Sequence, residues 1–228
     1  MRLFLSLLAI VSTAACVTTT PPQPTSSGPQ VPVSVARAIE VTRVIEPVAE
    51  SVCRRETPRQ NCDFAILVNR DPSSGINAFQ TIDPETGRPV VILTIGLIQE
   101  VRNADELAFV IGHEVAHHIA GHLDAQLEAA RAGAQILGAR AQAEGATQAE
   151  IIEAAQAGAL IGARQFSQSA ELEADALGTI IACRAGFDPT IGAEFFNQLP
   201  DPGVQILGTH PPNAVRIATV RQTAARSC

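Results

Sequence analysis

Apolar residues recur at helical spacing in two separate parts of the chain. In residues 34–54, SVARAIEVTRVIEPVAESVCR, the apolar positions have mixed helical spacing and predict a first helix. In residues 104–122 they return three and four positions apart, and Asn103 stands where an N-cap belongs, with Glu106 three residues later. The sequence therefore predicts a helix that begins after Asn103 and contains a cluster of histidines.

Three runs rich in β-branched residues lie between these two helices. They are DFAILVNR (residues 63–70), INAFQTI (76–82) and PVVILTIGLI (89–98), and the turn-forming stretches DPSSG and DPETGRP separate them. We expect three strands, at least two of them antiparallel. Together with the helices, they predict a mostly helical α+β domain that contains a small mixed or antiparallel sheet.

Good helix formers dominate the second half of the chain. Residues 123–169 are rich in Ala, Gln, Glu and Arg and predict one or two long helices, with a break near AEGATQAE (143–150). We expect a further helix over 169–186 and another that begins in 189–199. The GxxxG motif at 158–162 indicates close packing between helices, because polar residues interrupt the apolar run too soon for a membrane span.

The N-terminal stretch MRLFLSLLAIVSTAAC has the pattern of an export signal, with one Arg, a short apolar run and then small residues. The small residues before Cys16 resemble the lipobox of bacterial lipoproteins, in which the Cys is lipidated. Thr13 replaces the usual Leu, so cleavage near Ala15 by an ordinary signal peptidase stays open. We expect a signal peptide in residues 1–15, a lipidated N-terminus and flexible linker in 16–34, and the folded domain in 35–228.

Location and partners follow from this terminus and from the overall charge. Val17 is not the Asp that commonly retains lipoproteins at the inner membrane, so we expect an outer-membrane lipoprotein that faces the periplasm. Without the lipid, it would be a soluble periplasmic protein. The formal net charge is −7 and the pI is near 5.2, so we expect no nucleic-acid partner.

The cysteine count fits an exported protein. Five cysteines are present, and reserving Cys16 for lipid leaves an even set, which indicates two disulfides. Four cysteines allow three pairings, and closeness along the chain favours Cys53 with Cys62, leaving Cys183 for Cys228. A zinc site made of cysteines is the competing interpretation, but the chain has no CxxC motif to support it.

Four of the five histidines lie in HEVAHHIAGH, residues 113–122. His113 and His117 are four positions apart, so on a helix they are separated by only about 40° and both imidazoles can reach one metal ion. Glu114 lies near the same edge, where its carboxylate can contact a metal-bound water. On the same helical wheel His118 and His122 point roughly 100° and 140° away from His117, so we expect them to take no part in the site.

A catalytic zinc site needs a third protein ligand and one open position. The longer motif HExxHxxGxxH would provide a third histidine, but Ala120 and Leu123 occupy the positions of its Gly and last His. The stretch ELEAD, residues 171–175, offers a carboxylate instead, although alone it could be an ordinary acidic helix start. Glu171 and Asp175 share a helical face, so Glu171 can be the third ligand. Asp175 can then accept a hydrogen bond from a ligand histidine, and His113 is the one we expect.

Several separated motifs resemble those of the peptidase family of the CAAX prenyl protease and the HtpX heat-shock protease. They occur in the order seen in that family: NAF (77–79), ILTIGLI (92–98), DELAFVIGHEVAHHIAGH (105–122), ELEAD (171–175), AGFDP (185–189) and THPP (209–212). The resemblance implies a gluzincin-type zincin domain with one Zn²⁺ per chain and Glu171, rather than Glu173, as ligand. Unlike the polytopic members, this chain looks like an exported relative made of the soluble domain alone.

The resemblance also implies an activity, namely zinc-dependent hydrolysis of peptide bonds in proteins of the bacterial envelope, as part of protein quality control. Glu114 would act as the general base, and the strand near PVVILTIGLI could bind an extended peptide by edge pairing. Two alternatives remain open. A non-catalytic zinc-containing chaperone would not need Glu114, and a scaffold lipoprotein would bind no metal.

The fifth histidine, His210, lies in LGTHPPNAVR. The two prolines remove backbone donors and stiffen the loop, and a loop histidine without any role is the simplest interpretation. Because THPP matches a late motif of the family, His210 is also a candidate catalytic residue. It would either occupy the open position of the zinc, which keeps the enzyme latent, or donate a hydrogen bond to the oxyanion.

Overall fold

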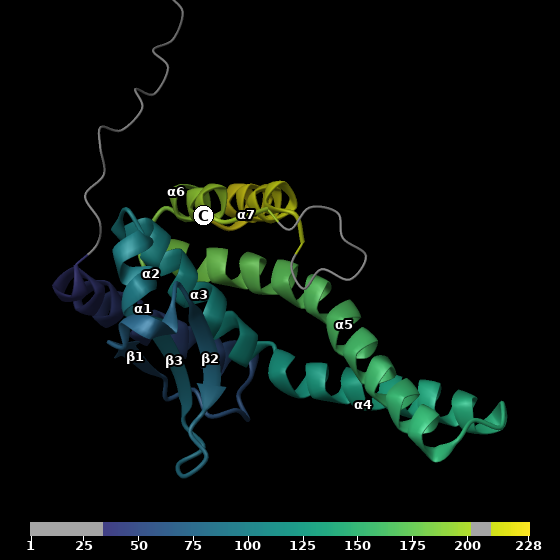
Figure 1. Cartoon of the computed structure of the whole chain (residues 1–228). Coiled ribbons are helices and arrows are strands. Elements are labelled where there is room, and N and C mark those ends of the chain that lie inside the picture. Colours follow the sequence, from purple (N-terminus) through teal and green to yellow (C-terminus); the bar gives the residue numbers. More distant parts are fainter. Residues whose placement is uncertain (1–33, 202–210) are drawn as a thin grey trace, which may run out of the picture. The chain divides into compact units, whose positions relative to one another are not determined.

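The computed structural model describes residues 34–201 and 211–228, apart from the side chains of residues 165–167. In this part of the chain helices predominate over a three-stranded sheet (Figure 1), which confirms the predicted α+β class. The predicted signal peptide and all of the linker except Ser34 lie outside the described residues.

The sheet is mixed. It consists of β1 (Ala65–Asn69), β2 (Ala78–Ile82) and β3 (Pro89–Thr94), in the order β1-β3-β2. β2 pairs antiparallel with β3, as expected for at least two strands, whereas β1 pairs parallel with β3.

The prediction that β3 offers an edge to a peptide is wrong, because both edges of β3 are already paired. A continuous apolar run is typical of a central strand that is covered on both faces. The run in β3 is of this kind, because Val90, Val91 and Leu93 are all buried. Among the described strands, β1 and β2 are the ones at the edges.

The helix α2 (Ile95–Glu100) begins where the predicted third strand was expected to continue to Ile98. Thr94 ends the strand and caps the helix, because its hydroxyl accepts a hydrogen bond from the Leu97 N–H at 3.2 Å. The same hydroxyl donates to the Asn77 carbonyl at 2.8 Å and accepts from the Asn77 N–H at 2.9 Å. Thr94 therefore ties the start of α2 to the residue that precedes β2.

The first two predicted helices are present as α1 (Val35–Glu56) and α3 (Ala104–Ile119). They contact each other and contribute to one apolar core, in which α1 buries Val41, Ile45 and Val52. The cap of α3 is the predicted one, because Asn103 accepts a hydrogen bond from the Glu106 N–H at 2.8 Å. The carboxylate of Glu106 in turn accepts from the backbone N–H of Arg102 at 2.7 Å, so the arrangement is a loose capping box.

The long helices α4 (His122–Ala143) and α5 (Gln148–Arg184) form a hairpin in which the two helices lie side by side (Figure 1). They break at the predicted place, with Gly145 at a φ of 81° and Thr147 in a capping box. The predicted boundary near residue 169 does not exist, because α5 continues through it.

The GxxxG motif packs the hairpin, as its sequence indicated. A Cβ on Gly158 would lie 2.1 Å from the Gly133 carbonyl oxygen, and one on Gly162 would lie 2.1 Å from that of Ala129. None of the described helices is long and apolar enough to span a membrane.

The C-terminal part covers one side of α3 and α5. It contains α6 (Pro189–Gly192), the 3₁₀ helix η2 (Ala193–Gln198) and α7 (Asn213–Ser227). Elsewhere, in the sheet region, a short 3₁₀ turn, η1 (Pro72–Ser74), lies between β1 and β2. The structure pairs Cys53 with Cys62 and Cys183 with Cys228, the pairing that the sequence favours. The second disulfide joins the end of α5 to the end of α7.

Candidate metal centre

Two glycines bring the helices of the candidate site together. A Cβ on Gly178 of α5 would lie 2.8 Å from the backbone nitrogen of His113, and one on Gly112 of α3 would lie 2.9 Å from the Gly178 carbonyl oxygen. Only residues without a side chain allow this approach of the two backbones. The close contact places Glu171, two helical turns before Gly178, opposite the histidines of α3.

Three side chains converge from these two helices. The Nε2 atoms of His113 and His117 lie 3.0 Å apart, and each is 3.5 Å from the nearer carboxylate oxygen of Glu171. In a tetrahedral zinc site with Zn–N bonds of about 2.05 Å, two ligand atoms lie about 3.3 Å apart. The observed distances bracket this value, and the donor set of two imidazoles and one carboxylate suits Zn²⁺, so the residues fit the ion.

Asp175 lies behind His113, where the sequence predicted it. Its Oδ1 is 2.9 Å from His113 Nδ1, and the side chain is fully buried. Burial lowers the pKa of His113, but hydrogen bonds to Asp175 and Glu171 outweigh it and raise this pKa to about 10. The pocket around His113 therefore favours a positive charge.

Arg216 of α7 is a residue of the site that the sequence interpretation missed. Its Nε and Nη2 donate to the two oxygens of Asp175 at 2.8 and 2.7 Å, and Nη2 lies 3.2 Å from Glu171 Oε2. The guanidinium also lies over the ring of Phe196, at 4.0 Å from its centroid. Burial would raise the pKa of Asp175, but Arg216 and His113 hold it below its ordinary value.

One signal could have indicated this arginine. Asp175 was expected to accept a hydrogen bond from a ligand histidine, and a carboxylate that is buried in such a place needs a cation or several donors. Arg216 follows the THPP motif by four residues, as the last residue of the stretch LGTHPPNAVR.

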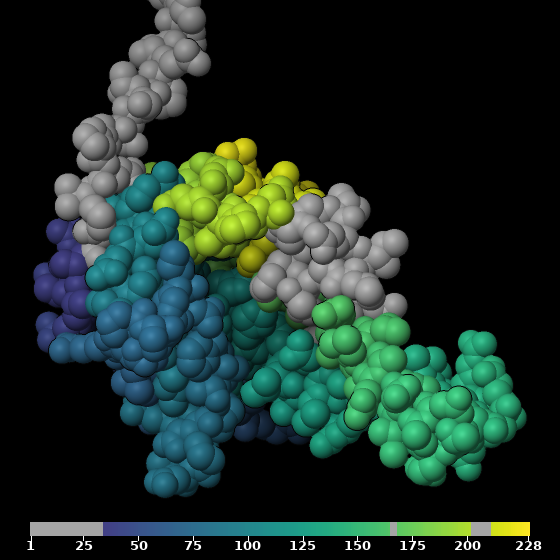
Figure 2. Space-filling view, in the orientation of Figure 1, coloured from purple at the N-terminus to yellow at the C-terminus, as the bar shows by residue number. Residues whose placement is uncertain are grey.

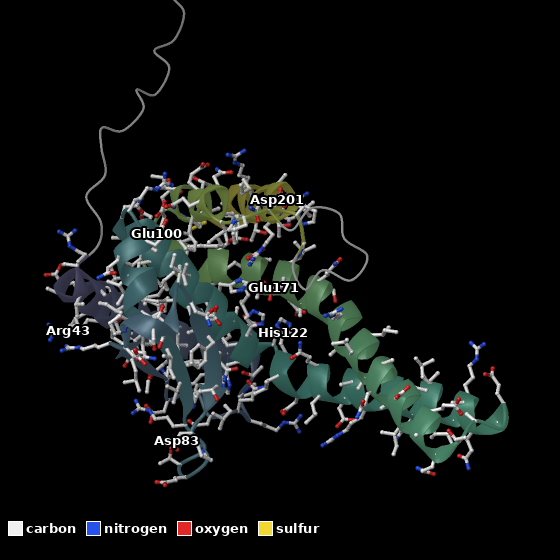
Figure 3. All side chains as sticks on the ribbon, viewed as in Figure 1. Arg43, Asp83, Glu100, His122, Glu171 and Asp201 are labelled. Atoms are coloured by element: carbon white, nitrogen blue, oxygen red, sulfur yellow. A yellow bond between two sulfur atoms is a disulfide. The ribbon has the colours of Figure 1, made fainter. Side chains whose placement is uncertain are left out.

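The prediction that His122 points away from the site is wrong. His122 Nδ1 lies 2.9 Å from His117 Nδ1, and His122 Nε2 lies 3.2 Å from Glu173 Oε2. Figure 3 labels His122 close to Glu171, with which it lines one cavity. The helical wheel fails here because α3 ends at Ile119 and the chain turns at Gly121, which has a φ of 68°. A glycine after an apolar helical run is a common helix end, so the sequence contained the signal.

His118 does stay out of the site, as expected. Its Nε2 lies 2.8 Å from the Asn61 carbonyl oxygen, and its ring meets Phe64 edge to face. Burial lowers the pKa of both His118 and His122.

Glu114 lines two cavities that also contain His117 and Glu171. The larger cavity, about 310 Å³, is bordered by His113, His117, Glu171 and Arg216 and by an apolar wall from α2, α3 and η2. The smaller, about 210 Å³, also contains His117 and Glu171. Figure 2 shows this face hollowed where α3 lies recessed behind the sheet and the C-terminal elements.

The edge strand β2 borders both cavities. Ala78 lines the larger one, and Phe79 and Gln80 line the smaller one. A strand with an unpaired edge among the described elements therefore runs past the candidate metal ligands. Two further predicted residues, Cys16 and His210, lie outside the described residues, so the structure does not place them.

Comparison with known proteins identifies the family. The model of peptidase family M48 matches residues 36–224. The β-barrel assembly-enhancing protease of Escherichia coli (strain K12) is 33% identical to the chain over 173 residues, which cover 69% of the chain and 34% of that protein. The protein of the same name from Yersinia pestis is 32% identical over the same length.

These relatives are about three times as long as the matched segment, since the match covers about a third of each. Their name differs from those of the HtpX and prenyl proteases, so the comparisons support the family as a whole rather than that branch. The family match and the convergence of His113, His117 and Glu171 together support a metalloprotease. The chain belongs to peptidase family M48.

Proposed function

We propose that the chain is a zinc-dependent endopeptidase. The observation that supports this most directly is the position of Glu114, a carboxylate that lines the same two cavities as His117 and Glu171. A metal site with a purely structural role is closed by protein ligands and has no use for a carboxylate at an open side. Here three ligands and an adjacent acid border an open cleft, which is the arrangement that hydrolysis requires.

The protein side chains would divide the work as follows. His113, His117 and Glu171 hold the ion, and Asp175 orients His113 through its Nδ1. Bound zinc supplies a Lewis acid that increases the acidity of water and polarises the scissile carbonyl. Glu114 accepts a proton from the attacking water and passes it to the leaving amine.

We infer that substrates bind as extended segments along β2. Its edge, which is unpaired among the described strands, offers backbone N–H and C=O groups to a peptide. Its residues line both cavities that the candidate ligands border. The larger cavity would then receive a substrate side chain against the apolar wall that includes Leu97, Phe109 and Phe196.

We further propose that the enzyme works in the bacterial envelope, on envelope proteins. Two observations support this location: the export pattern of residues 1–15, and the name of the relatives, which describes a protease that enhances β-barrel assembly. Lipidation of Cys16 would anchor the chain at the outer membrane, and a role in protein quality control fits such a place.

The decisive experiment compares wild type, Glu114→Gln and the control Glu153→Gln, which changes an exposed glutamate on α5. We expect wild type and control to hold one zinc per chain and to hydrolyse casein. Glu114→Gln should keep the zinc and lose hydrolysis by several orders of magnitude, because an amide cannot accept the proton. A wild-type protein that holds zinc but never cleaves would instead support a binding protein.

A further inference from the structure

The second nitrogen of His117 has a partner that the motif does not account for. Metal-binding histidines in proteins usually donate their remaining N–H to a carboxylate, a carbonyl or a water molecule. His113 follows this rule through Asp175, but His117 Nδ1 faces the Nδ1 of another imidazole, that of His122, at 2.9 Å.

Only one assignment of protons is compatible with a metal on His117. If its Nε2 holds the ion, its Nδ1 carries the hydrogen, and this hydrogen points at His122. The Nδ1 of His122 must then be the acceptor, which places the hydrogen of His122 on Nε2. That atom lies 3.2 Å from Glu173 Oε2, which can accept it. The direction of every hydrogen bond in the row is thus fixed.

Three different elements supply this row. His117 belongs to α3, His122 is the first residue of α4, and Glu173 belongs to α5. The turn at Gly121 brings His122 back toward His117, and His122 is buried whereas Glu173 is largely exposed. The buried, neutral imidazole of His122 can therefore accept the hydrogen bond from His117. The solvated carboxylate of Glu173 accepts a hydrogen bond from the opposite nitrogen of His122.

We propose that His122 is a positioning residue for the metal ligand His117, and that Glu173 fixes the tautomer of His122 that this role requires. The proposal rests on the proposed metal site but not on peptidase activity. Its consequence is that the two histidine ligands are supported differently, one by a buried aspartate and the other by an imidazole at the base of the hairpin.

The test uses the purified full chain and two polar replacements of His122. An asparagine places its Oδ1 near the position of the histidine Nδ1, so His122→Asn keeps an acceptor for His117. A glutamine reaches instead toward the position of Nε2 and Glu173, so His122→Gln loses that acceptor. His118→Asn is the matched control, because this neighbouring histidine contacts the Asn61 carbonyl.

The primary measurement is the zinc dissociation constant, obtained by competition with a chelator. Loss of such a supporting hydrogen bond typically weakens metal binding about 10–100-fold. We expect this loss in His122→Gln and only a small part of it in His122→Asn and His118→Asn. In the zinc-loaded protein, NMR should also detect a protected imidazole N–H of His117 in wild type and His122→Asn, and not in His122→Gln.

Two outcomes would overturn the proposal. Equal zinc affinity in wild type and His122→Gln would show that His117 needs no acceptor, and equal losses in the asparagine and glutamine variants would show that only packing is at stake. Failure of the proposed metal site itself looks different, because wild type would then bind no zinc at all.

Discussion

Replacing Arg216 by methionine should destabilise the fold strongly. Methionine keeps only the apolar stem of the arginine side chain, and it removes three contacts to carboxylate oxygens. Asp175 is fully buried and would be left with His113 as its remaining partner among the contacts described above. The variant therefore isolates the cost of a buried carboxylate that has lost its arginine.

The magnitude follows from the burial of both partners. Removing one member of a buried ion pair typically costs about 3–5 kcal/mol, because the charge left behind stays out of water. Here Asp175 keeps His113, but both Asp175 and Glu171 lose the arginine. For a domain of this size, each kcal/mol lowers the melting temperature by about 2–4 °C, so Arg216→Met should melt about 6–20 °C below wild type.

Urea unfolding of the metal-free, disulfide-bonded protein at pH 7 measures this cost directly. The matched control is Arg221→Met on the same helix, since Arg221 forms an exposed pair with Glu194 and should contribute about 0.5 kcal/mol. The reasoning about burial is refuted if Arg216→Met loses less than about 1 kcal/mol, or no more than the control does.

The pH dependence of this loss gives a second check. In wild type the pKa of Asp175 is lowered, so its stabilisation is present above the unfolded pKa of about 3.9 and is lost as the pH falls through the lower folded value. Without Arg216 the buried carboxyl takes up a proton at higher pH. The difference between wild type and variant should therefore be complete at pH 7 and should shrink toward pH 4.

The remaining predictions concern the ligands and the residues that the structure does not describe. Glu171→Ala should weaken zinc binding far more than Glu173→Ala, because only Glu171 faces both histidines, and the reverse order in a metal-content assay would move the third ligand. Cys16→Ser should release the protein from membranes into the soluble periplasmic fraction, and unchanged fractionation and mass would reject lipidation. His210→Ala should raise basal proteolysis if His210 occupies the zinc, or lower kcat if it stabilises the oxyanion; unchanged activity and zinc content would leave it as a loop residue.

Local patterns were enough to predict most of the elements and the convergence at the site. The four-residue spacings within HEVAH and ELEAD place side chains on one helical face, and that geometry holds wherever a helix is straight. The expected convergence of His113, His117 and Glu171 came from this rule together with the family resemblance, which implied Glu171 rather than Glu173.

The errors share one cause, since each concerns what happens between elements. The prediction that His122 points away from the site assumed that α3 continues past Gly121. The prediction that β3 binds a peptide at its edge assumed a strand order that local sequence does not encode. Arg216 reaches the site from α7, some forty residues after Asp175, so no spacing rule links the two. The helix α5 continues past residue 169 and packs against both α3 and α4, whereas the sequence interpretation divided it there.

The unbroken course of α5 has a mechanical consequence. Glu171 lies 23 residues from the start of this helix at Gln148, a distance of about 35 Å along its axis at 1.5 Å per residue. Since no break separates the hairpin tip from Glu171, a rotation of 5° about the metal centre would carry the tip through about 3 Å. A partner that binds the tip of the hairpin could therefore shift Glu171, because one continuous helix connects the two.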